Sequence, residues 1–367
     1  MNDKPYSITS KVLQFKQAAG TSRGTYLTRK IWIITWTFPE MDNLELSGEC
    51  APLPQLSIDD QPNLEQKINE FCALYVVCRQ HYNLTTPSYL PNSLLHRKGI
   101  SCLPDIENYP SIRFALESIE WLYEMKKNNQ SDYSVKIPIN GLIWMGDKAT
   151  MAQRINEKID AGFKCLKLKI GAINWEDEVE LIRTIRELYD KESLTIRVDA
   201  NGAFKPKESL AKLSKLAKYG LHSIEQPIHA GQWDEMAKCC KTSSLAIALD
   251  EELIPITKRV EKVKLLQKIR PQYIILKPSL MGGLSGSLEW IEIAEEMNIK
   301  WWITSALESN VGLDTLAYFT QYVCDKILSD ETFPHQGLGT GQLFVENFSS
   351  AFCIEGEYLT NQHGTKK

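Results

Sequence analysis

The sequence predicts an α/β protein in which a modified TIM-type (β/α) barrel follows a smaller α+β domain. From about residue 134 onward, short apolar segments alternate with amphipathic ones, and the unit of about 25 to 30 residues matches a βα unit of a parallel barrel. The first third lacks this alternation and indicates antiparallel strands followed by helices. The chain of 367 residues is long enough for a large barrel and a second domain.

The α+β domain is expected to span residues 1–130. It should contain a small antiparallel sheet and two helices whose apolar residues recur at helical spacing. The expected strands are 6–15, 26–38 and 43–54, and the expected helices are 63–80 and 111–126. Residues 16–24, between the first two strands, favour an ordinary hairpin connection, although loops rich in small residues can also carry binding residues.

The barrel is expected to span residues 131–345. Asp147 and Gly162 mark the start and the end of its first helix, as N-cap and as the residue past the C-terminus. The sequence pattern for an eighth strand near 336–344 is weak. An open doubly wound sheet is the alternative, because it would show the same alternation of strands and helices. Residues 346–367 are expected to pack back on the first domain. Seven strands are clear, at 134–144, 164–171, 194–201, 223–227, 245–251, 273–279 and 301–309.

Composition excludes several classes of partner. The net charge is −4, and no run of Lys or Arg indicates binding to nucleic acid or to an anionic membrane. The N-terminus lacks the apolar core of a signal peptide, and the most apolar segment, 31–38, is too short to span a bilayer. The nine cysteines show no CxxC spacing, so we interpret them as reduced core thiols of a cytoplasmic protein. These features leave the oligomeric state open.

Charged residues gather where the predicted barrel strands end. Lys167 and Lys169 lie two apart in a buried strand and therefore point to the same face. Such a pair is costly to bury unless carboxylates, a metal or a reaction needs it. In parallel barrels the chemistry lies at the C-terminal ends of the strands. Those ends carry Lys167, Lys169, Asp199, Asn201, Glu225, Asp250, Lys277 and Ser305.

Three consecutive strands end in a carboxylate, which indicates a metal site. Asp199, Glu225 and Asp250 would repel one another in a barrel mouth without a cation. Oxygen ligands with room for water suit Mg²⁺, with Mn²⁺ as a possible substitute. Zinc is disfavoured because no His stands at these strand ends. For any single residue, a surface ion pair remains the simpler interpretation.

Lysines on both sides of a metal suggest proton abstraction next to a substrate carboxylate. The metal would bind that carboxylate and stabilise the enediolate, while a lysine removes the proton. Lys169, nearer the strand end, is the better base, Lys167 would tune or position it, and Lys277 faces it from across the mouth. Arg197 points inward one layer deeper, where it could brace the ligands or join a core ion pair.

A glycine-rich turn follows the sixth strand. Residues 281–286 lack the Lys-Ser/Thr ending of a P-loop, so the turn is expected to allow a close approach of the backbone. We expect Gly282 and Gly283 to touch the substrate there. Asn201 and Ser305, at strand ends, are further expected contacts.

At these residues the chain resembles the enolase superfamily, in its muconate-lactonizing subgroup. The resemblance covers nearly the whole chain and implies an N-terminal capping domain, a modified barrel and Mg²⁺ chemistry with a lysine base. It also implies that Asp199, Glu225 and Asp250 bind the metal and that Glu251 supports them from behind. The matching pieces are Lys167-Leu168-Lys169, Asp199-Ala200-Asn201, Glu225-Gln226-Pro227, Asp250-Glu251 and Lys277-Pro278.

Within that subgroup the chain looks most like the o-succinylbenzoate synthase family. The similar segments are 20–24, 48–54 and 304–309. This resemblance implies dehydration of 2-succinyl-6-hydroxy-2,4-cyclohexadiene-1-carboxylate to 2-succinylbenzoate, in menaquinone biosynthesis. Lys169 would take the α-proton and its conjugate acid would assist departure of the hydroxyl, while Lys277 stays protonated. Ser22 and Arg23, in the first loop, are expected to contact this small carboxylate substrate.

Two other functions stay open. Dipeptide epimerases of the subgroup carry an acidic pair at the eighth strand, whereas residues 337–341 contain no acid and the next one is Glu346. That argues against a substrate with a free amino group. An N-acylamino acid racemase needs the same two lysines and is not excluded. A non-catalytic metal-binding scaffold is the alternative from another class.

Overall fold

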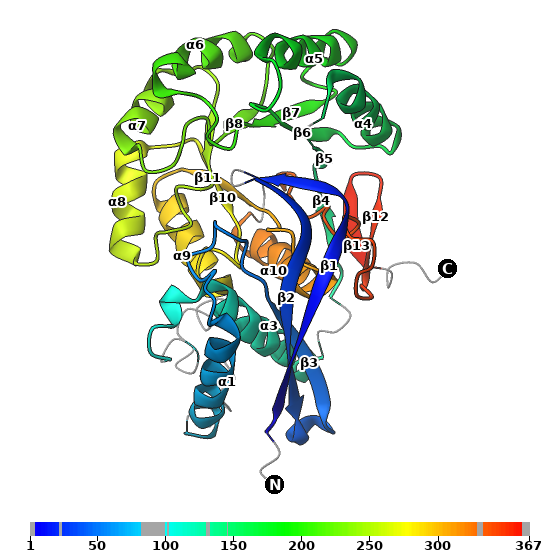
Figure 1. Cartoon of the computed structure of the whole chain (residues 1–367), viewed down its shortest axis with the longest axis vertical. Helices are drawn as coiled ribbons and strands as arrows, with labels where there is room; N and C mark the ends of the chain where they lie inside the picture. The colour runs from blue at the N-terminus through cyan, green and yellow to red at the C-terminus, as the bar shows by residue number, and fades with distance from the viewer. Residues whose placement is uncertain are drawn as a thin grey trace.

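The computed structural model describes residues 4–21, 24–81, 100, 103–129, 133–144, 146–328 and 333–361. Figure 1 shows an elongated molecule in which the barrel helices form an arc over the upper part and the N-terminal strands and helices lie below. Ser22 and Arg23, which are expected substrate contacts, lie outside the described residues.

The N-terminal sheet has the order β1-β2-β3 and is antiparallel throughout. Its strands are β1 (Tyr6–Thr21), β2 (Gly24–Phe38) and β3 (Leu44–Cys50), with the 3₁₀ turn η1 (Pro39–Met41) before β3. The hairpin prediction is confirmed, but both strands run further than expected, through most of residues 16–24. A register shift between Gln14 and Ala19 accommodates the extension.

Two long helices cover this sheet, as predicted. They are α1 (Leu64–His81) and α3 (Pro110–Lys127), and the short η2 (Ile106–Asn108) precedes α3. Proline suits the first turn of α3 because its missing N–H would have no partner there. Gly48 lets α3 approach β3 closely, since a Cβ at Gly48 would stand 2.0 Å from the Ala115 carbonyl oxygen.

The barrel contains seven parallel strands in the order β5 to β11, which confirms the seven predicted βα units. The strands are β5 (Gly141–Ile143), β6 (Cys165–Lys169), β7 (Thr195–Asp199), β8 (Ser223–Glu225), β9 (Ile247–Leu249), β10 (Tyr273–Leu276) and β11 (Lys300–Ile303). The helices are α4 (Lys148–Asp160), α5 (Trp175–Leu188), α6 (Pro206–Ala217), α7 (Trp233–Thr242), α8 (Arg259–Ile269), α9 (Gly283–Glu296) and α10 (Asn310–Ile327). Asp147 caps α4 by accepting from Thr150 N, as its position predicts.

Two residues, not an eighth strand, close the barrel. Gln336 bridges Ile139 and Gly337 bridges Thr304, both in parallel orientation. Asn140 N donates to the Gln336 carbonyl at 3.0 Å, and Gly337 N donates to that of Ile303 at 2.8 Å. The weak strand predicted at 336–344 is thus reduced to a short bridge, and its closure excludes an open doubly wound sheet.

The last described residues belong to a third, small sheet. Its order is β12-β13-β4, formed by β12 (Phe352–Glu355), β13 (Tyr358–Asn361) and β4 (Lys136–Pro138), so the predicted strand 134–144 divides between two sheets. Just before it, Val345 N donates to the Gln14 carbonyl and the Phe344 ring stacks on Phe15. The residues just before this sheet therefore adjoin β1, whereas the packing of residues 346–367 on the first domain and the boundaries at 130 and 345 stay predictions.

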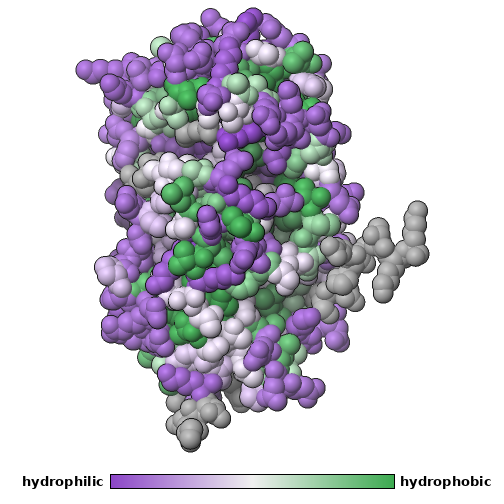
Figure 2. Space-filling model, turned by 45° about the vertical axis from the view of Figure 1, so that its right-hand side comes forward, coloured by the Kyte–Doolittle hydropathy of each residue, from purple (hydrophilic) through white to green (hydrophobic). Residues whose placement is uncertain are grey.

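The visible surface mixes polar and apolar residues. Figure 2 shows hydrophilic residues over most of the upper part of one face, and hydrophobic patches interrupted by hydrophilic side chains in its middle. Within the described ranges, no helix has both the length and the apolar character needed to cross a bilayer.

Candidate active site

Lys167 and Lys169 lie side by side on β6, which is buried along its whole length. Parallel pairing with β7 sets Lys169 opposite Asp199. Lys169 Nζ lies 2.7 Å from Asp199 Oδ2, and Lys167 Nζ lies 3.1 Å from the same oxygen and 2.5 Å from Glu225 Oε2. The strand alternation that predicted a shared face therefore brings both ammonium groups to the Asp199 carboxylate.

The three carboxylates stand on neighbouring strands at one end of the barrel. Asp199 ends β7, Glu225 ends β8 and is its register partner, and Asp250 follows β9. All three are at most 3% exposed. Lys277, which follows β10, forms an ion pair with Asp250 from the other side. The barrel thus brings together the three lysines and three carboxylates on which the predicted chemistry depends.

Burial and neighbouring charges shift the pKa values of these lysines and carboxylates. Burial would lower the pKa of Lys167, but the carboxylates of Asp199 and Glu225 hold it above its ordinary value. The pKa of Lys277 is raised for the same reason, mainly by Asp250. Burial raises the pKa of Glu225 to about 8, reinforced by the neighbouring Asp199. A pKa this high shows that the lysines alone do not stabilise the charged form of the Glu225 carboxylate.

The donor set suits a hard divalent cation. Glu225 Oε1 and Asp250 Oδ1 are buried and have no hydrogen-bond partner among the residues that the structure describes. Buried carboxylate oxygens of this kind are unfavourable unless they meet a cation. In the described ranges no three Asp, Glu, His or Cys side chains already form a metal site, because the lysine ammonium groups stand between the carboxylates. The chemistry of the oxygen donors, rather than a preformed cage, therefore fits Mg²⁺.

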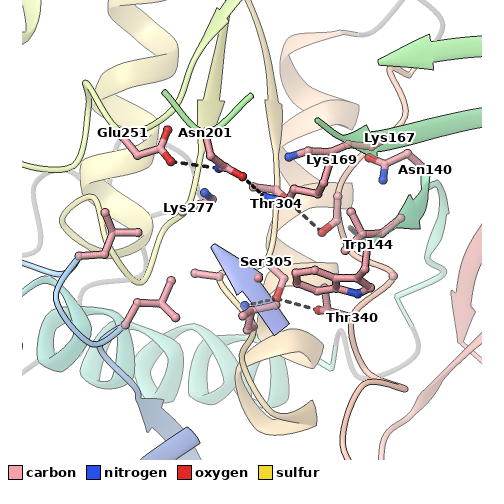
Figure 3. Close-up of a pocket in the computed structure, with 18 residues that line it drawn as sticks. Asn140, Trp144, Lys167, Lys169, Asn201, Glu251, Lys277, Thr304, Ser305 and Thr340 are labelled. Atoms are coloured by element: carbon pink, nitrogen blue, oxygen red, sulfur yellow. Dashed lines mark hydrogen bonds between the residues drawn. The ribbon is translucent and has the colours of Figure 1, made fainter. Parts of the chain in front are cut away.

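Asn201 and Glu251 extend the cluster. Lys169 Nζ donates to Asn201 Oδ1 at 2.7 Å, and Asn201 Nδ2 donates to Glu251 Oε1 at 3.1 Å, the chain of bonds drawn in Figure 3. Asn201 has φ of 44°, a left-handed conformation that asparagine tolerates better than most residues. Glu251 lines the cavity, so it reaches the site by way of Asn201 rather than from behind the metal ligands.

A cavity opens above these residues. Lys167, Lys169 and Lys277 line it from the barrel, as do Asn201, Glu251 and Ser305 among the predicted contacts. The N-terminal domain contributes to the same wall. Lining residues that were not among the predicted site residues are Gly20, Leu53, Leu56, Asn140, Leu142, Trp144, Thr304, Ala306, Leu307, Gly337, Gly339 and Thr340.

A buried network holds the loop after β11, which forms one wall of the cavity. The Glu308 carboxylate accepts from Ser305 Oγ at 2.6 Å and from Ala306 N at 2.7 Å. It also accepts from Ser279 Oγ, and Ser279 follows β10, so one carboxylate joins the ends of two strands. The loop needs this support because Leu307 has φ of 66°, which is strained for a non-glycine residue.

The N-terminal domain reaches this loop through Arg29 of β2 and Glu49 of β3. Arg29 donates to the carbonyls of Ala306 and Ala51. Glu49 accepts from Ser309 N at 3.0 Å and Ser309 Oγ at 2.5 Å, at the N-terminus of α10. Burial lowers the pKa of Arg29 against the attraction of nearby carboxylates, and it raises the pKa of Glu49. The cavity wall is therefore fixed from both domains.

Other predicted residues lie elsewhere. Gly282 and Gly283 do not line the cavity; their turn lies against α3, where a Cβ at Gly283 would stand 2.4 Å from Glu117 Oε2. Their close approach to a neighbour is correct, but that neighbour is a helix, so the substrate contact is not supported. Arg197 donates to the His335 carbonyl at 2.7 Å and lies 4.0 Å from the Trp302 ring centre. It fastens the closing segment of the barrel, which neither predicted role included.

Comparison with known proteins shows which family the chain belongs to. Residues 150–351 match the family described as enolase C-terminal domain-like. The chain is a member of the enolase superfamily. It is 40% identical to an o-succinylbenzoate synthase from Desulfotalea psychrophila, an alignment that covers 98% of this chain and 99% of that protein.

Solved structures of the superfamily agree in fold. The crystal structure of MenC from Desulfotalea psychrophila has a TM-score of 0.78 and 34% identity, covering 97% of this chain and 99% of that one. A dipeptide epimerase from Enterococcus faecalis, complexed with Mg and the dipeptide L-Leu-L-Tyr, has a TM-score of 0.79 at 18% identity, covering 98% and 96%. The latter supports the enolase-superfamily fold alone.

Proposed function

We propose that this chain catalyses the dehydration of 2-succinyl-6-hydroxy-2,4-cyclohexadiene-1-carboxylate to 2-succinylbenzoate, an o-succinylbenzoate synthase reaction of menaquinone biosynthesis. One observation carries the proposal. Lys169 from β6 and Lys277 from β10 line the same cavity from either side of three buried carboxylates. The relative that is 40% identical over nearly the full length has this activity by name, which supports the choice of reaction.

Lys169 is the proposed base. Its ammonium group is held by Asn201 and by Asp199, so its nitrogen is fixed at the cavity wall. A fixed base within reach of the α-carbon contributes by orientation as well as by basicity. After it takes the α-proton, the same ammonium group stands on the face from which the hydroxyl departs and can donate that proton to it.

Lys277 is the proposed electrostatic partner. Asp250 and Glu225 hold its pKa above the ordinary value, so it stays protonated at neutral pH. A fixed ammonium group that lines the cavity stabilises the negative charge that grows on the substrate carboxylate during proton removal. Lys167, also held protonated, keeps Asp199 and Glu225 in place.

Asp199, Glu225 and Asp250 are the proposed holders of Mg²⁺, with Mn²⁺ as a possible substitute. The bound ion would supply electrophilic stabilisation to the substrate carboxylate. The unpartnered oxygens of Glu225 and Asp250 support this assignment. We place the enzyme in the cytoplasm, since the eight described cysteines are all free thiols.

The test follows the loss of absorbance of the cyclohexadiene substrate with Mg²⁺, with and without a chelator. Lys169→Ala and Lys277→Ala should each reduce kcat at least about 100-fold, because general acid–base groups typically contribute that much. Lys164→Ala is the matched control, since Lys164 is exposed just before the same strand. Full activity in both active-site variants would instead support a non-catalytic scaffold.

A racemase that acts on N-acylamino acids is the second candidate. Lysines on two opposite sides of one cavity are what a two-base exchange of the α-proton requires. Residues 337–341, which line the cavity through Gly337, Gly339 and Thr340, offer no acid for a free amino group. Rapid wash-in of deuterium at the α-carbon of an N-succinylamino acid, with the cyclohexadiene left unchanged, would favour the racemase over the lyase.

A further inference from the structure

A second cavity adjoins the candidate active site. It shares four lining residues with the first: Asn140, Leu142, Trp144 and Gly339. Figure 3 shows Asn140 and Trp144 on the same side of the site as Lys167 and Lys169. The two cavities are therefore separated by little more than this wall.

The second cavity is rich in positive charge. Lys16, Arg154 and Lys158 line it, with Glu157 as the acid among its lining residues. Arg154 and Lys158 are four residues apart on α4, so they lie on the same face of the helix. The remainder of the lining is largely apolar, including Phe163. A charged and partly apolar cavity of this kind suits an organic anion.

Arg154 is fixed in place rather than free to move. Its Nη1 donates to the Trp144 carbonyl at 3.0 Å, and its Nη2 donates to Gln17 Oε1 at 2.8 Å. These two acceptors are uncharged oxygens. A guanidinium held in one orientation loses little further entropy when it binds a carboxylate, and its planar donors match two carboxylate oxygens. It stands beside the wall that divides the cavities.

Lys158 adds a partly dehydrated cation. Burial lowers the pKa of its ammonium group, although Glu157 opposes the shift. Its Nζ lies 5.1 Å from the centre of the Phe163 ring, which also lines the cavity. An anion in this cavity would restore the stabilisation that the ammonium group loses by leaving water.

The charges around the first cavity indicate which part of a substrate the second cavity could bind. With Lys169 neutral as the base, Lys167, Lys277 and a divalent cation carry four positive charges there, and the carboxylates of Asp199, Glu225, Asp250 and Glu251 balance them. The cation would take one substrate carboxylate as a ligand, and no charge is left over for another. A second carboxylate on the same molecule would have no counter-charge there and would be costly to bury.

We propose that the second cavity binds the distal carboxylate of a succinyl group, with Arg154 as its main contact and Lys158 as a supporting charge. This inference rests on the proposed function in one respect: the lyase substrate carries two carboxylates. N-succinylamino acids carry the same succinyl arm, so the subsite serves either reaction. The chain would thus select dicarboxylates whose second acid lies at the end of a short flexible arm.

The experiment compares ligands that differ only in the distal carboxylate. The first pair is 2-succinylbenzoate and 2-butanoylbenzoate, and the second is N-succinyl-L-phenylalanine and N-butanoyl-L-phenylalanine. Each is titrated calorimetrically with Mg²⁺ into the wild type, Arg154→Gln and the control Arg183→Gln, whose side chain is exposed on α5. The wild type should prefer a succinyl ligand at least about tenfold, as expected for a charge-assisted hydrogen bond.

Arg154→Gln should remove most of that preference and leave the butanoyl ligands unchanged, and Arg154→Lys should retain part of it. Equal losses for both members of a pair would mean that Arg154 only supports the fold, and the inference would fail. It would also fail if the wild type preferred neither succinyl ligand. A preference confined to the amino acid pair would uphold the subsite and overturn the lyase proposal.

Discussion

The network of Arg29 and Glu308 allows a quantitative test of how the two domains fix the cavity wall. Arg29→Met removes the buried guanidinium and leaves the Glu308 and Glu49 carboxylates uncompensated, which should cost about 3–5 kcal/mol. Glu308→Gln keeps the shape but weakens the bonds from Ser305 and Ala306, which should cost about 1–3 kcal/mol. The double variant should be destabilised by about 1–3 kcal/mol less than the sum, since it removes both the guanidinium and the Glu308 carboxylate and leaves only the Glu49 carboxylate uncompensated.

The assay is urea unfolding followed by circular dichroism for the wild type, both single variants and the double variant. A matched cycle on Arg183→Met and Glu187→Gln, an exposed pair on α5, should be additive within error. Single costs that sum without coupling in the Arg29 cycle would refute the view that Arg29 and Glu308 act as one unit. Loss of kcat/KM in Glu308→Gln, beyond its effect on stability, would locate the damage in the wall.

Three further outcomes are expected. Gly337→Ala should destabilise the protein by at least about 3 kcal/mol in thermal unfolding, because its Cβ would stand 1.9 Å from Thr304 Oγ1, whereas Gly20→Ala, with nothing within 4 Å, should not. Burial raises the pKa of Asp59 from 3.8 to about 6. The folded state therefore keeps a proton that the unfolded chain has released, and stability falls as pH rises through this window. The free energy of unfolding of Asp59→Asn, measured in urea relative to the wild type, should thus rise by about 1 kcal/mol from pH 5 to pH 7. A difference that stays constant over this range would contradict the prediction. Mg²⁺ at a hundredfold excess over its Kd should stabilise the wild type by about 3 kcal/mol, and Asp250→Asn should lose this gain; equal stabilisation of both would count against the metal assignment.

The fold was predictable where local pattern determines it. Apolar periodicity and end signals give the barrel helices, and Asp147 caps α4 where expected. The two-residue closure of the barrel was not predictable, because it depends on pairing with Ile139 and Thr304, which are distant in sequence. The glycine-rich composition of 337–341 has no strand propensity that could reveal such a bridge.

The charged part of the site was predictable, and its walls were not. Lys169 and Asp199 stand out because charges are rare in buried strands. Asn140, Trp144 and Thr340 carry no comparable signal, since their roles depend on which loops meet at the barrel mouth. Arg154 reads in the sequence as an ordinary surface charge on a helix, and its position beside the cavity emerges only from tertiary contacts.

The two-residue closure of the barrel has a consequence for biogenesis. Gln336 and Gly337 join β5 to β11, so a nascent chain has made every other barrel strand before either edge can be paired. Until then both edge strands expose backbone donors and acceptors that can recruit other chains. The same bridge places Gly337 in the cavity lining, so a chain truncated before this point would lack both a closed ring and part of the cavity wall. Closure of the barrel and assembly of the cavity thus coincide in one late step.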